Sequence, residues 1–362
     1  MKKQLRYVTF ILITFLISCS SKEEYVEVPN NNTPESPVVF NPDAAPSQQL
    51  SEYRFFEGNL KDLAPSYGVI PYEPINTLFT DYAHKKRFIW MPENVSASYV
   101  NDFSTLNFPI GTVLIKNFYY DTIQPNNTTR IIETRLMYNT SEGWKFAEYV
   151  WNDAQTEAYL DMNGSTTDIN FMENGVVKST SYRIPSEAEC FTCHKDGVNA
   201  TPIALKPQNI NKSLLFSDGN KNQLSKWIEM GYLNDNLPNS INTIANWEDT
   251  SLPIQDRMRG YLDINCAHCH SDNKHCDYRP IRLAFGDYVD ESSLGTCVPP
   301  DTEISPYTDI IVPNNVARSV MHFRLSTTLE DQRMPLLGRT LVHEEGVQLL
   351  EDWINSLTIT CD

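Results

Sequence analysis

The feature that most constrains this chain of 362 residues is a pair of Cys-x-x-Cys-His motifs. The first occupies residues 190–194 (Cys-Phe-Thr-Cys-His), and the second occupies residues 266–270 (Cys-Ala-His-Cys-His). Two cysteines separated by two residues and followed at once by histidine are typical of covalent haem attachment. Cysteines about one helical turn apart can reach both vinyl groups of one porphyrin, and the adjacent histidine then points its imidazole at the iron. The motifs therefore predict two covalently bound haem c groups.

Each motif supplies two thioether bonds and one proximal iron ligand. The predicted cofactor-binding residues are Cys190, Cys193 and His194 for the first haem, and Cys266, Cys269 and His270 for the second. A zinc site made of the four cysteines is the other interpretation of two Cys-x-x-Cys pairs. The pairs are much further apart than the roughly 15–20 residues of a zinc ribbon, and zinc leaves the histidine after each pair unexplained.

The start of the chain predicts export. Positively charged residues precede an apolar run over residues 7–17, which is shorter than the roughly 20 residues that a membrane-spanning helix needs. Residues 16–19 (Leu-Ile-Ser-Cys) resemble the lipobox of bacterial lipoproteins, and this resemblance implies cleavage before Cys19 and its acylation. An ordinary secretory signal is the alternative. We expect a cell-envelope protein, lipid-anchored in the outer membrane and facing the periplasm or the cell surface.

The charge of the chain limits its partners. The formal net charge is −17 at pH 7, and a surface this acidic repels nucleic acid and anionic lipid. It suits a basic redox partner, for example a periplasmic dehydrogenase or another cytochrome, although solubility alone also explains it. Contact with the membrane is expected only through the lipid anchor.

The first half of the folded chain has the pattern of β-strands. Residues 112–119, 131–139 and 144–151 are rich in β-branched and aromatic side chains. Asn174-Gly175 lies between two further apolar runs and is a strong signal for a hairpin. Residues 50–183 therefore predict an antiparallel β domain, arranged as a sandwich.

Helical signals begin after this domain. Ser186 and Glu189 can form a capping box in front of the first motif. Residues 222–230 and 254–264 have helical spacing, and so do residues 344–357, whose apolar positions fall on one face. The second half is therefore expected to be mainly helical.

Residues 258–357 resemble a class I c-type cytochrome domain, in which one helix runs into the haem motif and a terminal helix packs across it. Such domains carry a methionine late in the chain, often followed by proline, and residues 333–338 (Arg-Met-Pro-Leu-Leu-Gly) fit this pattern. The resemblance implies that Met334 is the distal ligand of the second haem. Further matches to a family of exported di-haem c-type cytochromes are residues 71–73, 78–82, 149–152, 188–190 and 333–335.

The expected fold class is thus α+β: an antiparallel β domain followed by a mainly α-helical, cytochrome c-like di-haem region. The expected parts are a lipoprotein signal peptide (1–18), a Pro-rich flexible tether (19–49), the β domain (50–183), a first haem segment (184–250) and a second, class I cytochrome c-like haem domain (251–362).

The distal ligand of the first haem stays open at this point. Met230 is the candidate within the same segment, and Met258 is a weaker one. His84, His322 or His343 could also reach the iron from elsewhere in the chain. A vacant position is the remaining alternative, and it would change the function.

Because histidine–methionine ligation closes both axial positions and raises the potential of haem iron, the resemblance implies single-electron transfer in the cell envelope. The alternative is a di-haem peroxidase-like oxidoreductase, in which the second haem supplies electrons to an open first haem. No residue outside the haem sites is assigned a catalytic role.

Three cysteines lie outside the anchor and the haem motifs. They are Cys276, Cys297 and Cys361. An oxidising compartment permits one disulfide among them. The expected pair is Cys276–Cys297, with Cys361 left over, although Cys361 could displace either partner.

Overall fold

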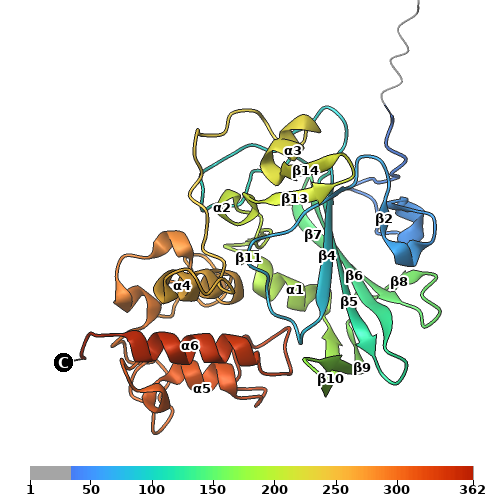
Figure 1. Ribbon diagram of the computed structural model, residues 1–362. Coiled ribbons are helices and arrows are strands. Elements are labelled where there is room, and N and C mark those ends of the chain that lie inside the picture. The colour runs from blue at the N-terminus through green and yellow to red at the C-terminus, as the bar shows by residue number, and fades with distance from the viewer. Residues whose placement is uncertain (1–33, 362) are drawn as a thin grey trace, which may run out of the picture. The chain divides into compact units, whose positions relative to one another are not determined.

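A twisted antiparallel sheet of eight strands dominates the structure, a computed structural model that describes residues 34–361 (Figure 1). Its strands are β3 (Ile70–Pro71), β4 (His84–Trp90), β5 (Val113–Ile123), β6 (Thr128–Thr140), β7 (Gly143–Trp151), β8 (Ala158–Leu160), β9 (Ser165–Glu173) and β10 (Val176–Ile184). The strand order is β10-β9-β5-β6-β7-β8. Strand β9 pairs with β5 at Ile123, whereas β4 pairs with residues 113–119 of β5. Strand β3 pairs with β4. The hairpin between β9 and β10 turns at Asn174-Gly175, which confirms that prediction.

One face of the sheet is covered by the chain that precedes it. Phe40 packs against Tyr53 and Phe55 and reaches Trp90 and Tyr138 on the sheet. The short elements on this side are η1 (Leu50–Tyr53), β1 (Phe56–Glu57), η2 (Leu60–Asp62) and β2 (Ala64–Pro65). Packing therefore begins within residues 19–49, whose composition predicts a tether, because its aromatic and aliphatic side chains reach a hydrophobic face. The structure has one large sheet here rather than a sandwich of two.

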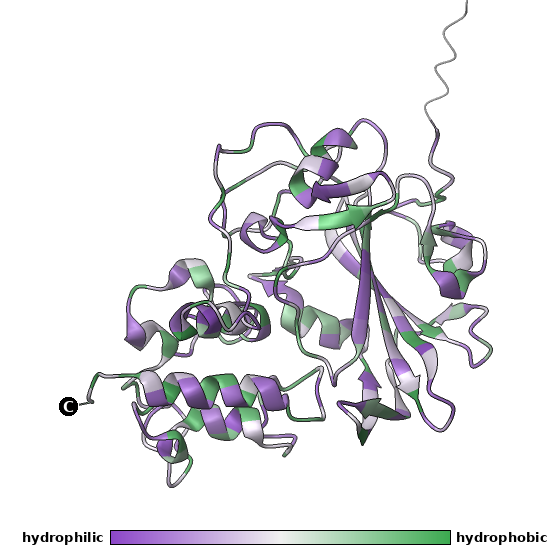
Figure 2. Cartoon of the chain, in the orientation of Figure 1, coloured by the Kyte–Doolittle hydropathy of each residue, from purple (hydrophilic) through white to green (hydrophobic). Residues whose placement is uncertain are grey.

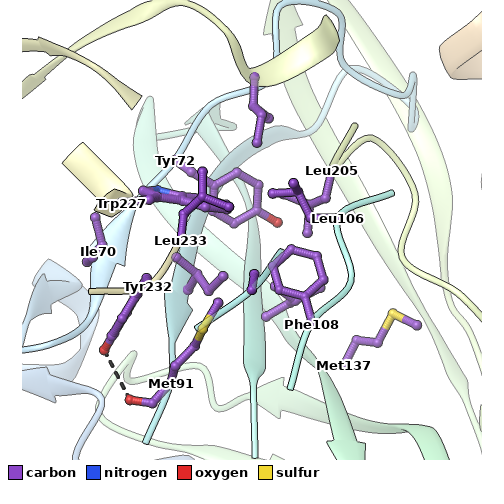
Figure 3. Packing of buried hydrophobic residues seen from close by; sticks show 14 of the residues in the cluster. Ile70, Tyr72, Met91, Leu106, Phe108, Met137, Leu205, Trp227, Tyr232 and Leu233 are labelled. Carbon is purple, nitrogen blue, oxygen red and sulfur yellow. Dashed lines mark hydrogen bonds between the residues drawn. The ribbon is translucent and has the colours of Figure 1, made fainter. Parts of the chain in front are cut away.

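The opposite face of the sheet is covered by later parts of the chain. Leu114 and Met137 lie on this face and belong to the same apolar cluster as Tyr72, Leu205 and Trp227 (Figure 3). The elements on this side are α1 (Glu187–His194), β11 (Lys195–Asp196), β12 (Asn199–Ala200), α2 (Pro207–Ile210), β13 (Ser213–Phe216), β14 (Gly219–Asn222) and α3 (Gln223–Glu229). The sheet is thus buried on both sides, and the first motif packs directly on β7.

The last third of the chain packs beside the sheet around three α-helices. Its elements are α4 (Ile254–Asn265), η3 (Phe285–Asp287), η4 (Glu291–Leu294), η5 (Val316–Arg318), α5 (Val320–Ser326) and α6 (Glu344–Ser356). Helix α6 packs against α4 and α5, and hydrophilic and hydrophobic residues alternate along it (Figure 2). Its fully buried side chains are Leu350, Trp353 and Ile354.

The fold class predicted from the sequence is wrong. The described chain is mostly β, its six α-helices are short, and no part of it forms a cytochrome-like helical region. Between Asn265 and Val320 the described chain contains no α-helix and no named strand, only 3₁₀ segments, turns, isolated β-bridges and irregular chain. The individual helices over residues 222–230, 254–264 and 344–357 were predicted correctly. The spacing of apolar residues identifies each helix separately. It does not show how much irregular chain lies between the helices, so it could not predict the fold class.

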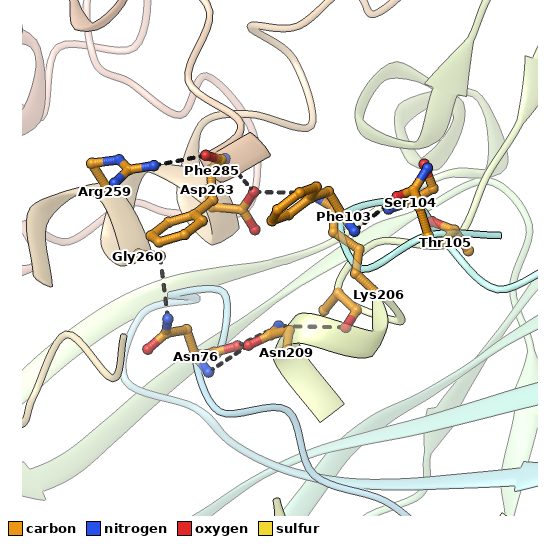
Figure 4. A network of polar contacts seen from close by, with 12 residues as sticks. Asn76, Phe103, Ser104, Thr105, Lys206, Asn209, Arg259, Gly260, Asp263 and Phe285 are labelled. Atoms are coloured by element: carbon orange, nitrogen blue, oxygen red, sulfur yellow. Dashed lines mark hydrogen bonds and ion pairs between the residues drawn. The ribbon is translucent and has the colours of Figure 1, made fainter. Parts of the chain in front are cut away.

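A polar network joins α4 to the rest of the molecule (Figure 4). Lys206 Nζ lies 2.8 Å from Asp263 Oδ1, and this carboxylate also accepts a bond from the backbone N–H of Phe285. Asn76 donates to the carbonyl oxygens of Ala245 and Gly260. Because these contacts connect segments far apart in the sequence, they fix the helix before the second motif relative to the sheet.

The disulfide is not the expected Cys276–Cys297 pair but the alternative in which Cys361 displaces one partner. Cys297 bonds to Cys361, and Cys276 is a buried thiol. The Cα atoms of the bonded pair lie 5.2 Å apart, within the range that a disulfide requires. The cysteine left over by sequence spacing is therefore the partner, because the chain after α6 returns beside the loop that carries Cys297. No helix in the described part of the chain is both long enough and apolar enough to cross a membrane.

Candidate functional site

The first motif lies on α1, which packs against the sheet. Ser186 caps this helix by accepting a bond from the backbone N–H of Glu189, whose carboxylate binds the Ser186 N–H in return, so the predicted capping box is confirmed. Cys190 is buried and donates its thiol hydrogen to Glu148 of β7, at 3.1 Å. Burial raises the pKa of the Cys190 thiol, so this sulfur is a neutral thiol.

His194 has the geometry of an iron ligand. Its Nδ1 lies 2.9 Å from the carbonyl oxygen of Thr201, which can only accept, so Nδ1 carries the ring hydrogen. The lone pair of the imidazole is therefore on Nε2. A hydrogen bond of this kind orients metal-binding histidines and fixes their tautomer. Burial lowers the pKa of His194 to about 4, which keeps the ring neutral.

A cavity opens between α1 and the sheet. It holds about 1260 Å³, including its open mouth, and Cys190, Cys193 and His194 all line it. The sheet contributes a row of charged side chains to the same wall. In strand order from β4 to β7, this charged row consists of Arg87, Lys116, Arg135 and Glu148.

The charged row makes this cavity strongly polar on one side. Arg135 lies 2.6 Å from Glu133 and 3.5 Å from Glu148. Burial raises the pKa of Glu148 to about 8, against the opposing effect of Arg135. Burial, together with repulsion by Arg87, holds the pKa of Lys116 well below its usual range.

The second motif lines a separate cavity. Helix α4 ends at Asn265, and the following turn presents Cys266, Cys269 and His270 to a space of about 1100 Å³, including its mouth. Met334 lines the same space, although it lies far along the chain. Burial lowers the pKa of His270 to about 4, so this imidazole is also neutral.

The loop that carries Met334 is held by two buried charges. The guanidinium of Arg339 donates to the carbonyl oxygens of Met334 and Arg324, at 2.9 and 2.8 Å. The carboxylate of Asp81 accepts from the backbone N–H groups of Thr340 and Leu341, at 2.7 and 2.8 Å. Asp81 belongs to the segment 78–82 that supported the family resemblance, and here it has a structural role that the sequence alone does not reveal.

The two motifs meet in space. The ligand atoms of Cys193, His268 and Cys269 all lie within 4.8 Å of one another. Cys193 and His268 line both cavities, as do Pro335 and Leu337 from the Met334 loop. His268, to which the sequence assigned no role, is 8% exposed and its Nδ1 has no hydrogen-bond partner among the described residues.

The structure does not bring the other candidate ligands to the first cavity. Met230 packs at the end of α3 and Met258 lies in the core around α4. His84 faces Asp121, His322 binds Glu351, and His343 stacks on Phe79 and Tyr261. None of these five candidates lines either cavity.

Met137 of β6 is the methionine that does line the first cavity. It lies opposite Phe146 of β7, whose ring centroid is 5.2 Å from that of His194. Sequence reasoning missed Met137 because it lies in a strand that precedes the motif. Cys19 lies outside the described residues.

The residues present fit a large, mainly apolar cofactor with iron. Both cavities are open to solvent, and their volumes of about 1100 and 1260 Å³ include the open mouths. Each is lined by a complete Cys-x-x-Cys-His motif, and His194 has its Nε2 lone pair available. Comparison with known proteins found no matching family model, no matching curated protein and no matching solved structure.

Proposed function

We propose that this protein is a di-haem c-type cytochrome that transfers single electrons in the cell envelope. The observation that carries the proposal is the meeting of the two motifs, which lie far apart in the sequence, at the common wall of two cavities. Electrons that enter at one site would have a short path to the other through this wall.

The residues of each motif would hold one haem by two thioether bonds and one proximal histidine. Cys190 and Cys193 with His194 would serve the first haem, and Cys266 and Cys269 with His270 the second. Haem iron with two axial protein ligands exchanges one electron and offers no open position. Met334 would be the distal ligand at the second site, where the Arg339 and Asp81 contacts hold its loop against the cavity.

The proposed location is the cell envelope, with attachment to the outer membrane through lipid on Cys19. The Cys297–Cys361 bond supports export, because disulfides persist in oxidising compartments and are rare in the cytosol. The proposed partners are other redox proteins, such as a periplasmic dehydrogenase or a second cytochrome, and the acidic charge suits partners with a basic face.

A different use of the same residues has one specific observation in its favour. Cys193, His268 and Cys269 could bind a transition metal directly, since two thiolates and one imidazole are a common zinc ligand set. This use excludes two haems, because thioether formation consumes both sulfurs.

Mass spectrometry of the denatured, full-length protein separates these functions. Two covalent haem additions are expected on each chain, and a mass equal to the apoprotein with bound zinc in the native state would overturn the proposal. The carrier is then distinguished from a peroxidase by ligand access. Reduced protein should bind little carbon monoxide and turn over hydrogen peroxide slowly. Rapid peroxide turnover that His194→Ala abolishes would favour the peroxidase instead.

A further inference from the structure

The charged row on the sheet contains more positive charge than its neighbours balance. Arg87 of β4 lies opposite Lys116 of β5, and Lys116 lies opposite Arg135 of β6. Side chains directly opposite on antiparallel strands have Cβ atoms roughly 5 Å apart, and like charges at that distance destabilise a sheet. Three basic side chains are therefore adjacent on the wall of the first cavity, and their mutual repulsion destabilises the sheet.

Only one of the three cations has a partner of its own. Arg135 pairs with Glu133 and Glu148, as described above. Within residues 34–361, the side chains of Arg87 and Lys116 make no hydrogen bond and no ion pair, and the one contact of the Lys116 ammonium is with the Phe118 ring, 4.8 Å from its centre. Arg87 is only 7% exposed and lines the cavity. A buried guanidinium without an anion is strongly unfavourable, so its position indicates a negatively charged ligand.

We propose that Arg87 and Lys116 form a binding site for two carboxylates, and that these are the propionates of the haem attached at Cys190 and Cys193. This inference rests on the proposed function. The charged row ends at Glu148, which contacts Cys190, so the cations lie on the wall that faces the attachment point. A guanidinium can bind a carboxylate with two parallel hydrogen bonds, and an ammonium adds a compact charge. Bound carboxylates would in turn offset the repulsion between the cations.

The test is the reduction potential of each haem in full-length protein with Arg87→Gln, Lys116→Gln or both changes. Reduction adds one negative charge to the haem, and nearby cations favour the reduced state. Each neutral variant should therefore lower the reduction potential of one haem. At a fixed solution potential, the ratio of reduced to oxidised haem should fall about tenfold, which equals about 59 mV for one electron. The potential of the other haem should stay unchanged.

Arg87→Lys and Lys86→Gln are the matched controls. Arg87→Lys retains the charge and should restore most of the potential, which a purely structural role of the side chain would not require. Lys86 is the exposed neighbour on β4, and its replacement should move neither potential. Unchanged potentials in both neutral variants, with both haems attached, would overturn this inference and leave the proposed function standing. Absence of covalent haem from the wild-type protein would instead overturn the proposed function.

Two measurements on wild-type protein complete the test. Infrared difference spectra with isotopically labelled propionates should show ion-paired carboxylates on one haem, and fully solvated carboxylates on both haems would contradict the assignment without any variant. The second measurement compares the reduction potentials in acetate and in chloride at equal ionic strength. It shows whether the site binds the haem propionates or free carboxylates. Potentials that do not respond to acetate support the propionates, whereas a shift that disappears in Arg87→Gln would mean that the site takes free carboxylates.

Discussion

The two candidate haem sites carry the same motif in different surroundings. The first is built on a sheet, and its wall includes the charged row from Arg87 to Glu148. The second is built from α4, irregular chain and the Met334 loop, and hydrophobic side chains such as Ile310 and Leu325 contribute to its lining. A Cys-x-x-Cys-His segment fixes how a haem is attached, whereas the surrounding chain sets its charge environment and second ligand. The sites should therefore differ in potential and in ligand access.

The largest expected effect comes from removing one pair of cysteines. Cys266→Ser combined with Cys269→Ser should reduce the covalent haem content from two to one per chain, because no other sulfur replaces the thioether bonds. The measurement is the mass of the denatured protein. Cys276→Ser is the matched control, since Cys276 lines the same cavity outside the motif and its loss should leave both haems attached. Loss of both haems from the double variant would show that the sites do not load independently.

The second prediction concerns the ligand that distinguishes the sites. Met334→Ala should open the second iron to carbon monoxide and lower its potential, while both haems stay covalently attached. Absorption spectra and a redox titration measure both effects. Met321→Leu is the comparison, because Met321 lines the same cavity from α5. If Met321→Leu rather than Met334→Ala opens the iron, the ligand assignment moves to Met321.

A third change acts on the stability of the region around the second site. Replacing Cys297 and Cys361 with serine should lower the free energy of unfolding by about 4 kcal/mol, since the bond closes a loop across 64 residues of sequence separation. Chemical denaturation of the oxidised protein gives the value. The spectrum of the first haem should persist to higher denaturant than that of the second. Simultaneous loss of both would indicate that the two sites unfold as one unit.

The smallest expected effect is local to the first site. Ser186→Ala removes the cap of α1 and should lower stability by about 1 kcal/mol. Thermal unfolding followed at the first haem measures it. Ser251→Ala removes an exposed hydroxyl from the loop before α4 and serves as the control. An equal effect of both variants would mean that the cap contributes nothing specific to the first site.

Local sequence patterns were sufficient where the physics is local. The capping box at Ser186, the hairpin at Asn174-Gly175 and the helix over residues 254–264 depend on contacts within a few residues, and all three are present. The two Cys-x-x-Cys-His motifs are local as well, since their spacing alone places two thiols and an imidazole together, while haem attachment at them stays a prediction. The prediction of the fold class was wrong because the fold class depends on how much irregular chain separates the helices. The residue spacing within each helix carries no information on that length.

Contacts between distant segments were decided only by the tertiary structure. The motifs identify Cys193 and Cys269, but only the folded chain brings them together and makes Cys297 and Cys361 neighbours. The charged row likewise requires the register of four strands, because each strand contributes one charge that is unremarkable in its own sequence. Residue spacing determines what can lie side by side within a turn or a strand, whereas long-range packing selects one arrangement among many.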